Sequence, residues 1–105
     1  MRIIYSPKAA IELHHVHSYL VDNFGVRIAN KKIDELTYHI RLLASSPQIG
    51  RLVRNGYRKT VQGQNVVLYE IRGEIIEIHH IVNSRTDWVN IILNDENFEN
   101  FFEKT

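Results

Sequence analysis

The chain contains no cysteine, which excludes a disulfide framework and any metal site built from thiolates. It also has no long apolar run, since nothing approaches the roughly 18 residues that a membrane-spanning helix requires. The apolar run at the start ends at Tyr5 and polar residues follow, so the N-terminus is not typical of a signal peptide. Repeats and low-complexity tracts are missing too. These absences predict a cytoplasmic protein.

What is present is an ordinary globular composition, with 105 residues, 44% hydrophobic and 24% charged. We expect a single domain over residues 1–93, followed by an acidic, aromatic tail at 94–105. Four interpretations of the tail stay open: packing on its own domain, partial disorder, dimerisation, or cover for the basic surface. Packing is the default, because three exposed phenylalanines would form an aggregation-prone patch.

Charge is distributed unevenly although the net charge is only +1. The first 54 residues carry eight Lys or Arg against four acids, and the rest carries five against eight. From Arg41 to Lys59 there are five cations and no acid. Such asymmetry suits a nucleic acid or an acidic partner, and it equally suits two solvated faces of opposite sign.

The first half of the chain predicts a short strand at residues 2–5 and then a helical hairpin. Ser6-Pro7 is typical of an N-cap followed by the first helical residue, which predicts a helix over about 7–23 that Gly25 ends. A second apolar stripe runs from Ala29 to Leu43, and Ser45-Ser46-Pro47 ends it. The short link predicts antiparallel helices with facing stripes.

The second half predicts an antiparallel meander with strands at about 57–61, 65–71 and 75–82, joined by two glycine turns. The middle strand is apolar on both faces, so we expect it to be central and most buried. In the last strand, alternation predicts one face with Ile76, Ile78, His80 and Val82, and another with Ile75, Glu77, His79 and Ile81.

After the meander, Ser84 and Asp87 have the spacing of a capping box that would open a short helix bearing an apolar side. Its apolar residues are Trp88, Ile91, Ile92 and Leu93. The predicted class is α+β: a short N-terminal strand, an antiparallel two-helix hairpin packed on a small antiparallel β-meander, and a C-terminal helical segment.

This order of elements carries several specific motifs. They are Ser6-Pro7-Lys8-Ala9-Ala10, the loop 46–51, Tyr57-Arg58, Val67-Leu68-Tyr69-Glu70-Ile71, and the ending 78–87. Together they resemble the RelE/ParE superfamily of toxins from bacterial type II toxin–antitoxin systems, over about residues 1–93. The long helical hairpin resembles the ParE branch more than the RelE branch.

The resemblance implies a toxin of the plasmid stabilisation type that inhibits growth and is neutralised by a cognate antitoxin. A ParE-like member would bind DNA gyrase and would not be an enzyme. The alternatives are a RelE-like mRNA interferase, which cleaves ribosome-bound mRNA without a metal, and an inactive or structural member of the fold. Neither branch uses a cofactor, and a homodimer stays open.

If the chain were a nuclease, the resemblance would place phosphate stabilisers at Arg58 and Arg85, with His80 and Tyr69 as proton-transfer groups. Two positions that are basic in nucleases are Thr60 and Val66 in this chain. This sparse set favours the ParE-like interpretation.

For partner binding we expect a basic surface with one aromatic residue. Its candidates are Arg51, Arg54, Arg58, Lys59, Arg85 and Trp88. His14 and His17 have the spacing of a metal pair, but no carboxylate completes a ligand motif around them, so we expect no metal.

Overall fold

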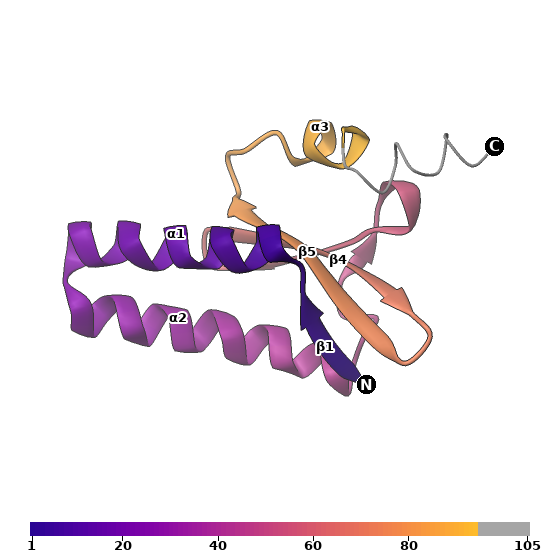
Figure 1. The fold of residues 1–105 in the computed structure, drawn as a ribbon, viewed down its shortest axis with the longest axis horizontal. Helices are drawn as coiled ribbons and strands as arrows, with labels where there is room; N and C mark the ends of the chain where they lie inside the picture. The colour runs from indigo at the N-terminus through magenta and orange to yellow at the C-terminus, as the bar shows by residue number, and fades with distance from the viewer. Residues whose placement is uncertain (95–105) are drawn as a thin grey trace.

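Five strands form one sheet in the order β1-β5-β4-β3-β2 in the computed structural model, which describes residues 1–94 (Figure 1). The strands are β1 Arg2–Tyr5, β2 Arg51–Leu52, β3 Arg58–Gln62, β4 Asn65–Arg72 and β5 Ile75–Asn83. Only the β1–β5 pair is parallel. The predicted meander is confirmed with β4 at its centre, whereas the two-residue strand β2 lies in a segment expected to be a connection.

The helical hairpin is confirmed as α1 Pro7–Phe24 and α2 Val26–Arg41, with a 3-10 turn at Leu42–Ala44 continuing α2. Ser6 caps α1, its hydroxyl oxygen accepting the N–H of Ala9 at 3.0 Å. Gly25, at φ 88°, lets the chain reverse. The hairpin lies along one face of the sheet and projects beyond it (Figure 1). No helix within residues 1–94 is long and apolar enough to cross a membrane.

The sheet is buried on both faces, which explains the two-sided hydrophobicity of β4. Helices α1 and α2 cover one face through a cluster that contains Leu36, Ile40, Val67 and Tyr69. Helix α3, Trp88–Leu93, covers the other face by burying Ile92 in a cluster with Tyr57, Val66 and Leu68. The side chains from Val66 to Tyr69 on β4 therefore alternate between the α3 face and the hairpin face.

Simple alternation is wrong beyond Ile78, because β5 contains a β-bulge. Tyr69 pairs with Ile78 while Leu68 pairs with His80, so β5 has one extra residue at this point. As a result Ile81 joins Ile76 and Ile78 in the cluster under the hairpin, and Val82 joins the cluster under α3. The carboxylate of Glu12 on α1 accepts the N–H of Ile81 at 3.0 Å, which satisfies a backbone donor beside the irregularity.

The short C-terminal helix is confirmed, but the expected cap at Ser84 is wrong. Ser84 still belongs to the end of the sheet, where its N–H donates to the carbonyl of Gln64 at 2.8 Å. Asp87 caps α3 instead, accepting the N–H of Asn90 at 3.3 Å. The expectation for the acidic tail concerns residues 95–105, which lie outside the described part of the chain.

One hydroxyl group fixes the connection from α2 to the sheet. The hydroxyl of Tyr69 donates to the carbonyl of Pro47 at 2.7 Å and accepts the N–H of Gly50 at 2.9 Å. A Cβ at Gly50 would lie 2.5 Å from the same oxygen, so glycine is required for this approach. Arg58 adds a hydrogen bond from Nη1 to the carbonyl of Gly50 at 2.8 Å. The loop is thereby held on the hairpin side of the sheet, and β2 begins only at Arg51.

We expect Tyr69→Phe to lower the free energy of unfolding by about 1–3 kcal/mol, because it leaves a buried N–H and a carbonyl without their partner. Urea denaturation measures the loss. Tyr19→Phe removes an exposed hydroxyl from α1 and should change stability by less than about 0.5 kcal/mol. Equal stability of the two variants would contradict the role assigned to this hydroxyl.

Candidate functional site

The two candidate phosphate-binding arginines belong to different levels of the sheet. Arg58 opens β3 and pairs with Tyr69, whereas Arg85 follows the end of β5, where Asn83 pairs with Asn65. Tyr69 and Asn65 are four residues apart on β4, which corresponds to about 14 Å along the strand. Arg58 Nη1 donates to the carbonyl of Gly50 at 2.8 Å, so this guanidinium is held by the loop before β2 and away from the level at which Arg85 leaves the sheet.

The candidate proton-transfer groups are buried and engaged. Burial raises the pKa of Tyr69 more than the hydrogen bond from Gly50 and the charge of Arg58 lower it, so the phenol stays protonated and donates to Pro47. His80 is 3% exposed, with Nδ1 lying 3.4 Å from the Glu12 carboxylate. In this arrangement both side chains make contacts inside the protein, Tyr69 with Pro47 and His80 with Glu12.

The two positions that are basic in nucleases have structural contacts here. Val66 is buried in the cluster under α3. Thr60 is bridged to α2, its hydroxyl lying 2.8 Å from Nε2 of His39. Sequence reasoning missed this role of His39, because the residue lies off the apolar stripe of its helix and its partner is 21 residues away.

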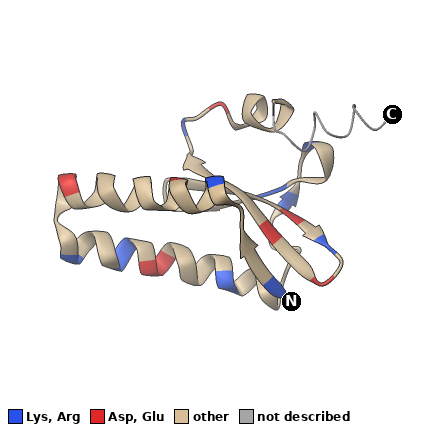
Figure 2. Cartoon of the chain, in the orientation of Figure 1, with Lys and Arg blue, Asp and Glu red and all other residues tan. Residues whose placement is uncertain are grey.

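Most of the candidate partner-binding residues gather along the outer edge formed by β2 and β3, next to α3 (Figure 2). We call this the basic edge, made up of Arg51, Arg54, Arg58 and Lys59. Lys59 lies over the ring of Trp88 at 4.6 Å from its centroid, a cation–π contact that joins β3 to α3. Arg51 pairs with Lys59 and shares its face, whereas Arg58 faces the hairpin side. Arg85 lies apart, in the exposed loop before α3.

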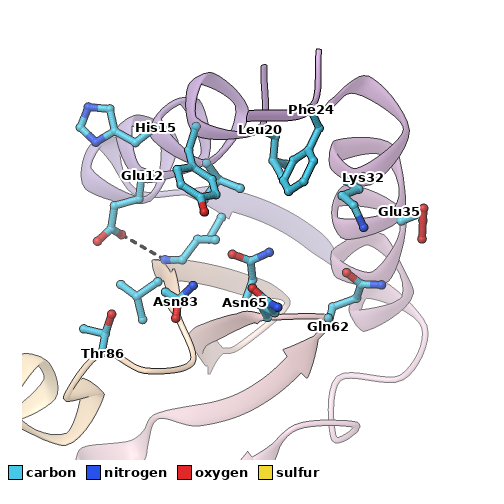
Figure 3. A pocket seen from close by; sticks show the side chains of 16 residues that line it. Glu12, His15, Leu20, Phe24, Lys32, Glu35, Gln62, Asn65, Asn83 and Thr86 are labelled. Atoms are coloured by element: carbon cyan, nitrogen blue, oxygen red, sulfur yellow. Dashed lines mark hydrogen bonds between the residues drawn. The ribbon is translucent and has the colours of Figure 1, made fainter. Parts of the chain in front are cut away.

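A cavity of about 600 Å³ lies where the outer half of the hairpin meets the end of the sheet. Leu20 and Phe24 of α1 line one side (Figure 3), and Lys32 and Glu35 of α2 lie at another. The strand ends contribute polar groups that include Asn65. Sequence analysis did not anticipate this cavity, because its walls come from two helices and three strands that lie far apart in the sequence.

A charged cluster lies on the α3 face of β4 and β5. His79 Nε2 is 2.9 Å from Glu70 and 3.4 Å from Glu77, and Arg72 is 3.2 Å from Glu70. Burial would raise the pKa of Glu70, but the hydrogen bond from His79 and the charge of Arg72 outweigh it, so the net pKa is lowered. Within the described residues, no three His, Asp or Glu side chains are placed to hold a metal ion.

Because folding lowers the pKa of Glu70, its contribution to stability is present above the unfolded carboxyl value of about 4.3 and is lost as pH falls through the folded value. We therefore expect Glu70→Gln to lose less stability than the unmodified chain between about pH 5.5 and about pH 3. Glu74→Gln, which removes an exposed carboxylate from the adjacent turn, should lose as much as the unmodified chain. Urea denaturation across this range tests the difference, and parallel curves for all three proteins would refute it.

Comparison with known proteins agrees with this architecture. The sequence model of the family described as ParE toxin of type II toxin–antitoxin system, parDE, matches residues 3–88. The fold is similar to a chain in the solved structure of the chromosomal ParDE TA system from P. aeruginosa, with a TM-score of 0.70 and 20% identity. That similarity covers 79% of this chain and 95% of the other. No curated protein matches in sequence. Since the family match spans most of its length, the chain belongs to the ParE toxins of type II toxin–antitoxin systems.

Proposed function

We propose that this toxin inhibits growth by binding DNA gyrase and that a cognate antitoxin neutralises it. The observation that carries the proposal is the family match over residues 3–88. The long hairpin of 18 and 16 residues supports the ParE-like interpretation drawn from the sequence. Both activities are binding functions, so they need exposed surface and not a preorganised reaction centre.

The geometry gives less support to a ribosome-dependent nuclease. Transesterification of RNA needs a proton acceptor and a phosphate stabiliser within hydrogen-bond reach of the reacting atoms. Here Arg58 is level with Tyr69, about 14 Å along the strand direction from the end of β5 that Arg85 follows. The phenol of Tyr69 is hydrogen-bonded to Pro47 and Gly50. The third candidate, an inactive member of the fold, differs from the other two because it predicts normal growth.

The basic edge supports binding to a partner that carries acidic groups. Arg51 and Arg54 are exposed, and no acid lies between Arg41 and Lys59 in the sequence. Charges at the rim of an interface steer association and discriminate against partners of the wrong sign. We assign neutralisation by the antitoxin to this surface.

Induced expression of the toxin alone should arrest growth with a DNA damage response while transcripts stay intact. The purified chain should also inhibit supercoiling by gyrase. Sequencing of transcript ends provides the decisive comparison: cleavage on ribosomes that Arg85→Ala abolishes would replace the gyrase proposal with the nuclease. Undisturbed growth at a verified protein level would favour the inactive alternative.

Co-expression with the protein encoded by the adjacent reading frame should restore growth, and the two proteins should copurify. We expect Arg51→Glu with Arg54→Glu to weaken the complex by about tenfold or more, because each reversal turns attraction into repulsion. Arg27→Glu is the matched control, since it reverses an exposed charge on α2 away from the basic edge. Isothermal titration compares the affinities of the two variants for the antitoxin. Equal losses of affinity in both would contradict the assignment of antitoxin binding to the basic edge.

A further inference from the structure

The cavity at the outer half of the hairpin has the size of a small-molecule site. Its volume of about 600 Å³ lies within the range of about 300–1,000 Å³ that is typical of ligand-binding cavities. Leu20, which is half-buried, and Ile81, which is buried, give it apolar surface. Neither of the proposed binding functions requires an enclosed space of this kind.

Two aromatic side chains that line the cavity remain exposed. Tyr19 is 62% exposed and Phe24 is 53% exposed, and both come from α1. Figure 3 shows the side chain of Phe24 extending from this helix toward Asn65. Exposed aromatic faces beside a cavity fit a flat ligand, because stacking on a planar ring buries their apolar area.

Carboxamide groups line the opposite wall, at the strand ends and in the turn between β3 and β4. They belong to Gln62, Gln64, Asn65 and Asn83. Among the hydrogen bonds formed within residues 1–94, none involves the side chain of Gln62, Gln64 or Asn65. A carboxamide presents a donor beside an acceptor, which lets it pair with two neighbouring atoms on the edge of a purine base.

The charges around the cavity limit how anionic its ligand can be. Among the described lining residues, Lys32 is the only lysine or arginine, whereas Glu12 and Glu35 are both acidic. The carboxylate of Glu12 already accepts the N–H of Ile81 at 3.0 Å. One cation and two carboxylates accommodate a neutral ligand or a single phosphate group, and they disfavour a triphosphate.

A solvated groove between the hairpin and the sheet is the alternative explanation, since polar groups at the ends of strands are common on protein surfaces. It accounts for the carboxamides. It does not account for Tyr19 and Phe24 on the facing wall, because leaving two apolar rings in water beside one hollow is unfavourable. Aromatic faces opposite unused carboxamides favour a ligand.

We propose that this cavity binds a purine nucleoside or its monophosphate. The base stacks on Phe24, and the carboxamides of Gln62 and Asn65 hydrogen-bond to its edge. Lys32 contacts the phosphate when one is present. No residue of the basic edge lines the cavity, so the inference does not depend on the proposed contacts with gyrase or with an antitoxin.

NMR titration of the full chain with adenosine, AMP and ATP tests the site. Adenosine and AMP should shift the amide signals of Gln62 and Asn65 in a saturable way and raise the midpoint of thermal unfolding. ATP should bind at least about tenfold more weakly than AMP, because the carboxylates repel its additional phosphates. Absence of saturable shifts at millimolar adenosine and AMP would overturn the inference. Tightest binding by ATP, with shifts confined to the basic edge, would show attraction to phosphate alone and would overturn it too.

Matched substitutions separate stacking from recognition of the base edge. Phe24→Ala should weaken AMP binding by about tenfold, because it removes the stacking face. Tyr38→Ala removes a ring that is 56% exposed on α2 and does not line the cavity, so affinity should stay within about twofold. Gln62→Leu should weaken binding by about tenfold, whereas Gln48→Leu, at an exposed position outside the cavity, should not. Far-UV circular dichroism verifies folding, and equal affinities within each pair would refute the site.

The same spectra distinguish other occupants of the cavity. Shifts at Gln62 and Asn65 that the protein encoded by the adjacent reading frame produces, and that AMP does not, would assign the cavity to the antitoxin. Shifts that grow with protein concentration in the absence of ligand would assign it to a second copy of the chain. Either result would overturn the inference.

Discussion

The hydroxyl of Tyr69 joins the two halves of this molecule. It lies on the central strand and binds the carbonyl of Pro47 and the N–H of Gly50, just after the helical hairpin ends. A buried hydroxyl with both a donor and an acceptor partner is a strong geometric constraint, because losing either contact leaves a polar group unsatisfied. The same constraint fixes where β2 begins, and so it determines how much of β3 is covered.

The hairpin, the meander and the central position of β4 follow from local patterns: apolar stripes, the Ser6-Pro7 start and glycine turns. Such signals act over a few residues, which is why they can be read directly. The bulge in β5 depends on how β5 pairs with β4 and is supported by Glu12, about seventy residues earlier in the chain. No local pattern carries that information, so Ile81 and Val82 were assigned to the wrong faces.

The candidate site likewise combines features that the sequence predicts with features that depend on contacts between distant residues. Four of the cations expected to bind a partner do lie along one edge, whereas Arg85 lies apart. The sequence does not reveal which side chains are already engaged in structural contacts. Tyr69 and His80 have suitable chemistry for proton transfer, but the hydroxyl of Tyr69 is hydrogen-bonded to a loop and His80 is buried beside Glu12. His39, by contrast, joins α2 to β3 through a contact with no sequence signature.

The parallel pairing of β1 with β5 has a consequence for how the chain is made. Arg2 pairs with Ile75, so β1 cannot pair until a strand 73 residues later in the chain has formed. Closing so long a loop lowers the conformational entropy of the chain before the β1–β5 contacts can stabilise it. Contacts between residues far apart in the sequence therefore slow folding. On a ribosome, the sheet cannot be completed until most of the chain has emerged. The toxin therefore completes its sheet only after β5 has been synthesised and has left the ribosome.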